Sequence, residues 1–348
     1  MRHFNLYLLL LAILITPGVA SATQDKAEDG KKTHEQSTMK NAPAPPKEVE
    51  NWKVLDDIKS GLQPRPPVVY QQEDQAEFVR EVVRVQWREG DPIDLYIMRP
   101  KTTGKVPVVL YLYGYPSESA QFRDNGWGKR ATAKGFAAVG FTSALTGPRY
   151  HFRPMKQWFI SELQESMGSS VHDVQLVLNY LADRGDMDMN HVGMIGMGSG
   201  ASIAILAAQA DSRIKALDLL DPWGDWPDWL RESPAVPEEE RAKYTTPEFL
   251  KSVAALDPVA YLPKLKIMRL RLQQTLTDPV CPKSARERIA TSLRDPRYLD
   301  RYADSEVLMK AWQVDGLSGW IKQQLRSQMQ VEGQTGGLTT LDSNSAAN

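Results

Sequence analysis

The chain has 348 residues, 42% of them hydrophobic, and a formal net charge of −1 at pH 7. This length and apolar content suit one large α/β domain or two smaller ones, and the balanced charge gives no electrostatic reason to expect a nucleic-acid partner. The single cysteine, Cys281, excludes an internal disulfide. A hydrophobic core must therefore stabilise the fold, and we expect the thiol to be buried in it.

The first residues have the pattern of a secretory signal peptide. Arg2 supplies a positive charge, and Leu6 to Ile15 form an apolar run that is too short to span a bilayer. The run is followed by Ala20-Ser21-Ala22, which matches an A-x-A cleavage site. We therefore predict that residues 1–22 are removed and that the mature protein is exported, periplasmic or secreted, without a stable membrane anchor. An uncleaved membrane anchor is the alternative.

Two polar segments flank the part of the chain that can fold. Residues 23–50 and 331–348 are poor in bulky apolar side chains, so burial cannot offset the entropy of ordering them. We predict a disordered leader over 23–50, one domain over 51–330 and a disordered tail over 331–348.

The domain begins with strands. Phe78 to Met98 has the pattern of two strands joined by a turn at Glu89 to Pro92. Val106 to Gly114 is a continuous apolar run with β-branched residues, and Gly135 to Ser143 is a second apolar run. Such runs are typical of strands that are buried on both faces of a parallel sheet.

Helices then alternate with strands. Ser169 to Arg184 is predicted to be a helix, with Ser170 as its N-cap and one apolar face that contains Val174, Val177, Leu178 and Leu181. His191 to Ile195 is predicted to be a strand, and a glycine turn and a helix to about Ala210 follow it.

The remaining segments continue the alternation. We expect further strands at Ile214 to Asp221, Leu265 to Gln273 and Ser305 to Gln313. A closing helix would carry an apolar face made of Leu317, Trp320, Ile321 and Leu325. The whole pattern predicts an α/β fold with a mostly parallel, doubly wound sheet flanked by helices. Ligands of such sheets bind beyond the carboxyl ends of the strands.

Three stretches resemble parts of the α/β-hydrolase fold, especially dienelactone-hydrolase-like and acetyl-esterase-like secreted members. They are VVLYLYGYPS, which resembles the oxyanion strand and loop, VGMIGMGSGAS, which resembles the nucleophile elbow, and LTDPVCP, which resembles the acid loop. The resemblance covers roughly Phe78 to Leu325. It implies an α/β-hydrolase-like sheet with a short Trp-rich lid insertion, and a serine, an acid and a histidine as catalytic residues.

The elbow departs from the family pattern at its centre. The family has G-x-S-x-G, in which the serine is the nucleophile. The matching residues are Gly196 to Gly200, which place Gly198 at the nucleophile position and Ser199 one residue later. A shifted register would centre Ser199 but would put Met197 where the family has glycine. We expect a vacant nucleophile position at Gly198 and a capping role for Ser199 at the start of the helix, with Ser199 as nucleophile the alternative.

The resemblance implies that the acid is retained as Asp278, whereas the histidine is missing. In this fold the histidine follows the acid along the chain, and none of the five histidines follows Asp278: His3, His34, His151, His172 and His191. The segment EVLMKAWQVDGLSGWI offers Asp315 and Ser318, which cannot replace an imidazole near neutral pH. His151 or His172 could reach the site from elsewhere, or both could be ordinary structural histidines.

Other residues are candidates for ligand binding. The backbone N–H of Tyr115 corresponds to an oxyanion donor and would bind an anion or a carbonyl group, and His151 lies in a connection at the same predicted edge. Trp223 and Trp226 in DPWGDWPDWL could stack on a sugar or an aromatic ligand, or could close the core. The sequence has no phosphate loop, dinucleotide fingerprint or zinc spacing, so we expect no cofactor and no metal.

These observations favour an exported pseudoenzyme of the α/β-hydrolase fold that binds a small molecule or a protein partner in its former catalytic pocket. One alternative is a carboxylic-ester hydrolase whose non-standard site uses Ser199 or a pocket histidine. Another is a structural module whose pocket is filled with side chains.

Overall fold

The computed structural model describes residues 34–35, 65–88, 90–115, 119–145, 149, 160–267, 269–294 and 298–342. The chain divides into two units, Met1–Thr33 and His34–Asn348, and all the described residues belong to the second. The predicted signal peptide, His3 and His151 lie outside the described residues.

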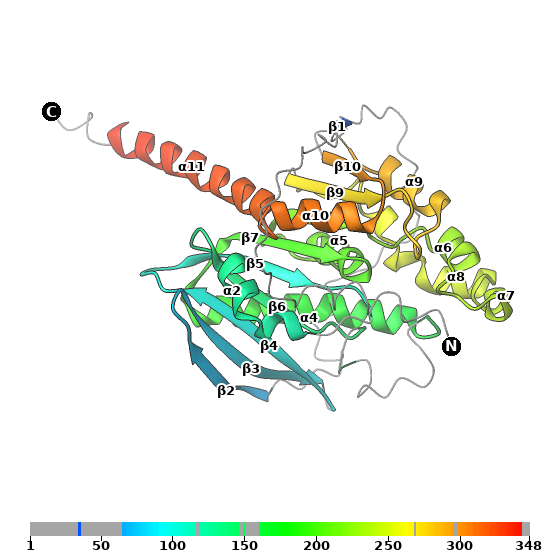
Figure 1. Cartoon of the computed structure of the whole chain (residues 1–348), viewed down its shortest axis with the longest axis horizontal. Helices are drawn as coiled ribbons and strands as arrows, with labels where there is room; N and C mark the ends of the chain where they lie inside the picture. The colour runs from blue at the N-terminus through cyan, green and yellow to red at the C-terminus, as the bar shows by residue number, and fades with distance from the viewer. Residues whose placement is uncertain are drawn as a thin grey trace, which may run out of the picture. The chain divides into compact units, whose positions relative to one another are not determined.

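A mixed sheet forms the centre of the second unit (Figure 1). The described part of the chain gives it ten strands in the order β1-β10-β9-β8-β7-β5-β6-β4-β3-β2. The strands are β1 (His34–Glu35), β2 (Arg65–Asp74), β3 (Phe78–Arg88), β4 (Asp91–Pro100), β5 (Val106–Leu112), β6 (Ala137–Phe141), β7 (Met187–Met197), β8 (Ile214–Leu220), β9 (Arg269–Thr275) and β10 (Tyr298–Tyr302).

The central part of this sheet is parallel. Neighbouring strands run parallel from β10 through β9, β8, β7 and β5 to β6, whereas β4, β3, β2 and β1 pair antiparallel. The predicted α/β class with a mostly parallel sheet is therefore confirmed. Strand β1 contains His34 and Glu35 from the segment predicted to be a disordered leader, and it pairs with the edge strand β10 because that edge offers unpaired backbone groups.

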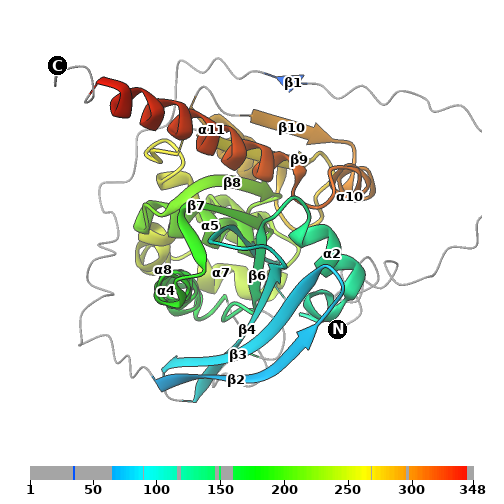
Figure 2. The ribbon, with the colours of Figure 1, turned by 90° about the vertical axis from the view of Figure 1, so that its left-hand side faces the viewer.

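Helices cover both faces of the sheet (Figure 2). The helices of the described part are α2 (Asn125–Thr132), α4 (Leu163–Arg184), α5 (Ser199–Ala210), α6 (Trp226–Glu232), α7 (Arg241–Tyr244), α8 (Pro247–Val253), α9 (Lys283–Thr291), α10 (Ser305–Val314) and α11 (Gly319–Asp342). Helices α4 and α5 pack in one hydrophobic cluster, and α2, α10 and α11 pack in a second cluster on the opposite face.

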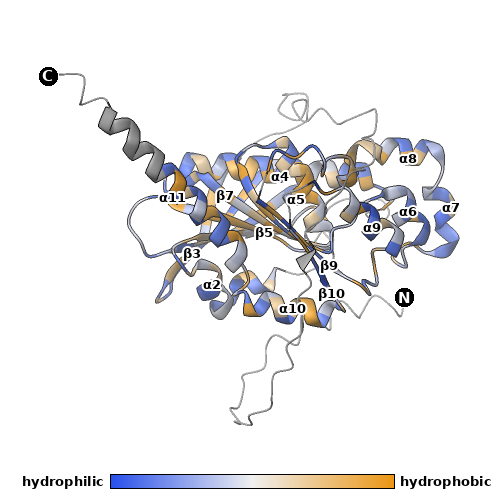
Figure 3. Cartoon of the chain, turned by 90° about the horizontal axis from the view of Figure 1, so that it is seen from above, coloured by the Kyte–Doolittle hydropathy of each residue, from blue (hydrophilic) through white to orange (hydrophobic). Residues whose placement is uncertain are grey.

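Strand β5 separates these two clusters, and its apolar colour is visible at the centre of Figure 3. Val108 and Leu110 belong to the first cluster, whereas Val109 and Tyr111 belong to the second. Successive side chains of a strand point to opposite faces. The continuous apolar run therefore does form a strand that is buried on both faces, as predicted. None of the helices in the described residues is both long enough and apolar enough to cross a membrane.

The segment Ser305 to Gln313, predicted to be a strand, is the helix α10, and the strand β10 just before it was missed. The carboxylate of Asp304 caps α10 by accepting a hydrogen bond of 2.9 Å from the backbone N–H of Val307. Leu308 and Trp312 are buried and lie four residues apart, which is the spacing of one helical face.

Two helix boundaries also differ from the prediction. Helix α4 begins at Leu163, so Ser170 lies inside it and donates to the carbonyl of Ser166 at 2.8 Å instead of capping the helix. Helix α11 continues to Asp342, so residues 331–342 of the predicted tail are helical. A helix that has already formed can propagate through polar residues, because extension avoids the cost of nucleation.

Candidate functional site

The turn between β7 and α5 has the shape of a nucleophile elbow. Gly198 is its central residue, with φ +56° and ψ −123°, a conformation that L side chains rarely adopt. The backbone N–H of Gly198 donates to the carbonyl of Leu220 at 2.8 Å, which ties the turn to the end of β8. Glycine adopts this backbone without strain, so the turn is retained although its central residue has no side chain.

The flanking glycines establish the register of the turn. A Cβ atom on Gly196 would lie 2.4 Å from Cα of Ala201, and one on Gly200 would lie 2.4 Å from the carbonyl oxygen of Leu112. A Cβ atom on Gly198 would meet nothing nearer than Nε1 of Trp223, at 3.5 Å. The outer glycines are therefore required by close packing, whereas the central position has room for a side chain.

Ser199 lies one residue after the centre of the elbow. It is the first residue of α5 and is 1% exposed. Its hydroxyl oxygen accepts a hydrogen bond of 2.8 Å from the backbone N–H of Tyr115, which is the predicted oxyanion donor. Ser199 and Tyr115 thus bond to each other within the protein.

Asp278 lies in the loop after β9 and is 9% exposed. Its Oδ1 accepts hydrogen bonds from the backbone N–H groups of Val280, at 2.7 Å, and Cys281, at 3.1 Å. Its Oδ2 is buried and has no hydrogen-bond partner among the described residues. Burial raises the pKa of the Asp278 carboxyl above its ordinary value, although the two N–H groups oppose this shift. The thiol of Cys281 is buried, as expected, and burial raises its pKa as well.

A second carboxyl, which the sequence analysis did not single out, interacts with Asp278. Asp221 follows β8 directly, and its carboxylate accepts hydrogen bonds from the backbone N–H of Thr275, at 2.7 Å, and from its hydroxyl, at 3.2 Å. Burial and the charge of Asp278 raise the pKa of Asp221 to about 7. The sequence could have indicated Asp221, because this residue directly follows a buried apolar run and so lies at the same sheet edge as Asp278.

The described histidines do not complete a triad at this edge. His172 on α4 lines a hollow of about 550 Å³ together with Arg213, which precedes β8. Gly198 follows the end of β7, which runs parallel to β8, so this hollow lies toward the opposite edge of the sheet. His191 lies between the carboxylates of Asp188, at 2.7 Å, and Glu332, at 3.0 Å. His34 lies in β1.

Of the two residues offered in place of the histidine, Asp315 has hydrogen-bond partners within the fold. Asp315 accepts hydrogen bonds from the side chain of Arg271 and from the backbone N–H of Trp320, both at 3.1 Å. Ser318 is fully buried in the same connection between α10 and α11. The loop that directly follows β10 instead contains Asp304, which caps α10.

The tryptophans of the insertion differ in their placement. Trp223 lies beside Gly198 and stacks on Trp229 with ring centroids 5.3 Å apart. Trp226 is 1% exposed, and its indole N–H donates to the carbonyl of Leu256 at 3.1 Å, so it closes the core and offers no ring face to a ligand. The predicted short lid is a larger group of helices, α6, α7 and α8, between β8 and β9 (Figure 1).

No group of three or more histidine, cysteine, aspartate or glutamate side chains in the described residues could hold a metal ion.

The carboxyl edge of the sheet thus combines three features: an elbow whose central residue has no side chain, a tryptophan beside it and two interacting carboxyls. These groups can bind a ligand and exchange a proton, and Gly198 provides no side chain at the centre of the elbow.

Comparisons with known proteins agree with this architecture. The structure is similar to that of acetyl xylan esterase 1 from Thermoanaerobacterium sp. JW/SL YS485, with a TM-score of 0.60 and 17% identity over 73% of this chain and 86% of that chain. It is also similar to an acetyl xylan esterase from Paenibacillus sp. R4, with a TM-score of 0.61 and 18% identity over 78% of this chain and 96% of that chain. Such identities show a shared fold.

A search of curated proteins gives no match to the chain. The model of the X-Pro dipeptidyl-peptidase (S15) family matches residues 89–332, which include both the elbow and the acid loop. The chain therefore belongs to the X-Pro dipeptidyl-peptidase (S15) family of α/β-hydrolase-fold proteins.

Proposed function

We propose that this protein is an exported member of its family that has lost hydrolysis through a serine nucleophile and binds a small molecule at the former catalytic edge. The observation that carries the proposal is Gly198, which occupies the centre of the elbow with φ +56°. An acyl-enzyme intermediate requires a side-chain oxygen or sulfur at that position, and glycine has neither.

Two further contacts support this proposal. The hydroxyl of Ser199 faces the backbone N–H of Tyr115 and is buried, so a substrate could approach it only after that hydrogen bond breaks. Its conversion to a nucleophile also needs a base, whereas His172 lines the hollow toward the opposite sheet edge and His191 lies between the carboxylates of Asp188 and Glu332. The alternative esterase that uses Ser199 is therefore less well supported than ligand binding.

The chemistry of the edge suggests what the ligand carries. Trp223 is buried and presents the edge of its indole beside Gly198, so it would form one wall of a ligand site at the elbow centre. Oδ2 of Asp278 lacks a partner among the described residues, so it can exchange a hydrogen bond with a ligand hydroxyl or carbonyl. We therefore favour a small, uncharged, oxygen-bearing ligand over a protein partner.

A second candidate function follows from the interaction between the two carboxyls. Burial and the charge of Asp278 raise the pKa of Asp221 to about 7, so Asp221 is partly protonated near neutral pH. Such a pair can take a proton from a water molecule while that water attacks a carbonyl, and can give a proton to the carbonyl oxygen. This mechanism would hydrolyse esters or peptides without a covalent intermediate.

Activity-based labelling separates these functions. The purified protein would be treated with a fluorophosphonate probe, and its turnover of short acyl esters and X-Pro dipeptide arylamides would be measured beside Ser199→Ala and Asp278→Asn. We expect no labelling and no turnover. Labelling that Ser199→Ala abolishes would overturn the proposal, whereas unlabelled turnover that Asp278→Asn abolishes would establish the second candidate.

Ligand binding needs its own measurement. Quenching of tryptophan fluorescence would be titrated with acetylated xylo-oligosaccharides and with aryl esters, using wild type and Gly198→Leu. The leucine side chain would project from the centre of the elbow toward Trp223, and we expect it to abolish any quenching. Saturable quenching that is unchanged in Gly198→Leu would place the ligand elsewhere.

Export is tested by the mature N-terminus. The signal peptide predicted over residues 1–22 should be absent from protein recovered outside the cytoplasm, and the chain should begin near Thr23. N-terminal sequencing of protein from the periplasm and from the medium of a bacterial host would test this. Intact Met1 in a purely cytoplasmic pool would contradict the proposal.

A further inference from the structure

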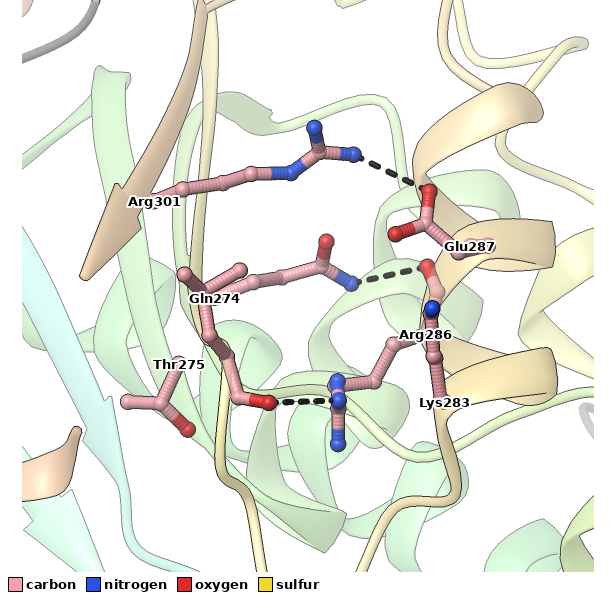
Figure 4. A pocket seen from close by; sticks show the side chains of 7 residues that line it. Gln274, Thr275, Lys283, Arg286, Glu287 and Arg301 are labelled. Atoms are coloured by element: carbon pink, nitrogen blue, oxygen red, sulfur yellow. Dashed lines mark hydrogen bonds and ion pairs between the residues drawn. The ribbon is translucent and has the colours of Figure 1, made fainter. Parts of the chain in front are cut away.

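A hollow of about 240 Å³ lies at the carboxyl ends of β9 and β10, beside α9 (Figure 4). It is lined by Gln274, Thr275, Leu276, Lys283, Arg286, Glu287 and Arg301. Pockets for drug-sized ligands measure about 300–1,000 Å³, so this hollow suits a smaller molecule.

A buried amide forms part of the wall of this hollow. Gln274 is 3% exposed, and its Nε2 donates to the carbonyl of Arg286 at 3.0 Å. A carbonyl can only accept, so this bond orients the amide nitrogen toward Arg286 and leaves the amide oxygen to face the hollow, as Figure 4 shows. No hydrogen bond between described residues reaches this oxygen. An occupant with a hydroxyl or N–H group would satisfy it.

The charge around the hollow is positive. Lys283, Arg286 and Arg301 carry three positive charges, and Glu287 carries one negative charge. Arg301 pairs with Glu287 at 3.1 Å, whereas Lys283 is exposed and has no ion pair among the described residues. The net excess favours an anion at the mouth of the hollow.

We propose that this hollow binds a small organic acid that also carries hydroxyl groups, with its carboxylate held by Lys283 and Arg301 and a hydroxyl donated to Oε1 of Gln274. The two requirements come from different residues, the cations at the rim and the buried amide. A simple fatty acid would satisfy only the first, and a neutral sugar would satisfy only the second.

The site also touches the loop that carries Asp278. The guanidinium of Arg286 donates to the carbonyls of Leu276 and Cys281, both at 2.7 Å, and so joins the two ends of that loop. An acid in the hollow lies against the same guanidinium and limits its movement. Occupation should therefore slow hydrogen exchange of the backbone amides between Leu276 and Cys281.

Calorimetric titration of the purified full chain with three six-carbon compounds tests the proposal. Gluconate has both a carboxylate and hydroxyls, hexanoate has only the carboxylate, and glucose has only hydroxyls. We expect saturable binding of gluconate, accompanied by slower exchange in the Leu276–Cys281 loop, and at least about fivefold weaker binding of the other two. Absence of gluconate binding, or equal binding of hexanoate, overturns the proposal.

Charge variants locate the binding. Lys283→Gln should weaken gluconate binding about two- to fivefold, whereas Glu287→Gln should strengthen it by a similar factor because it removes the negative charge. Lys251→Gln, which changes an exposed lysine on α8, is the matched control and should have no effect. Gluconate binding that responds equally to Lys283→Gln and Lys251→Gln, or that Glu287→Gln does not strengthen, would overturn this location.

Discussion

The backbone N–H of Tyr115 donates a hydrogen bond of 2.8 Å to the hydroxyl of Ser199. This bond joins the loop after β5 to the first turn of α5, across the elbow that carries Gly198. A backbone donor that would face a reacting carbonyl in a serine hydrolase therefore faces a buried serine of the protein itself. The contact stabilises the elbow in the observed conformation.

Replacement of this serine should lower the stability of the fold. Ser199→Ala removes a buried acceptor of the Tyr115 N–H group, so we expect the free energy of unfolding to fall by about 1–3 kcal/mol. Urea denaturation measures the change, with Ser212→Ala, an exposed serine, as the control. An unchanged midpoint would show that the Tyr115–Ser199 bond contributes nothing to the fold.

Two elbow glycines, Gly198 and Gly200, should differ in their tolerance of alanine. Gly198→Ala adds a Cβ with space around it, so only its backbone conformation, φ +56° and ψ −123°, costs stability, about 1–3 kcal/mol. Gly200→Ala brings a Cβ to 2.4 Å from the carbonyl oxygen of Leu112 and should cost clearly more. Gly185→Ala, which has a φ of +76° and no atom near its Cβ, is the control for the φ effect. Thermal unfolding of the three variants would rank them, and equal losses at Gly198 and Gly200 would contradict the packing argument.

Asp221 should make stability depend on pH in the acid range. Its pKa is raised to about 7 in the folded protein, so the folded state binds more protons than the unfolded state above the ordinary aspartate pKa. The contribution of Asp221 to the free energy of unfolding is fully present below about pH 4, and it is lost as the pH rises through 7. Asp221→Asn should therefore flatten the decrease in unfolding free energy between pH 5 and 7.5. Urea unfolding across this range measures it, and Asp183→Asn, an exposed aspartate, should keep the wild-type slope.

Lys322 should act in a higher pH range and with the opposite slope. This lysine on α11 is 2% exposed, and its ammonium donates to the carbonyls of Ala131, at 2.7 Å, and Arg130, at 3.2 Å. Burial, together with the nearby Lys134 and Arg326, lowers its pKa to about 7. The unfolded chain then binds more protons between pH 7 and 10, so stability should increase with pH in that range.

Lys322→Met tests this slope. The variant should lose the rise in unfolding free energy between pH 7 and 9.5, which denaturant titrations would follow. The matched control is Lys310→Met on α10, where Glu306 raises the pKa of the exposed lysine. A slope that persists in Lys322→Met would assign the pH dependence to another group.

Local patterns in the sequence were sufficient for the central strands and for the elbow. The run from Val106 to Leu112 has no charged side chain and one polar atom, the hydroxyl of Tyr111, which predicts burial on both faces. The spacing of Gly196, Gly198 and Gly200 identifies the turn because its backbone must approach β5 and α5 closely. The segment Ser305 to Val314 shows the limit of such patterns, since a short apolar run fits either a strand or a helix until its packing partners are known.

The sequence by itself determined the fold class, the absence of a side chain at the elbow centre and the lack of a histidine after Asp278, because each depends on residue type and order along the chain. Only the tertiary structure decided that Asp221 interacts with Asp278, that Ser199 bonds to Tyr115 and that Trp226 is buried. These contacts join residues far apart in the chain. They arise because the sheet places β5, β7, β8 and β9 side by side, and no local pattern specifies that order of strands.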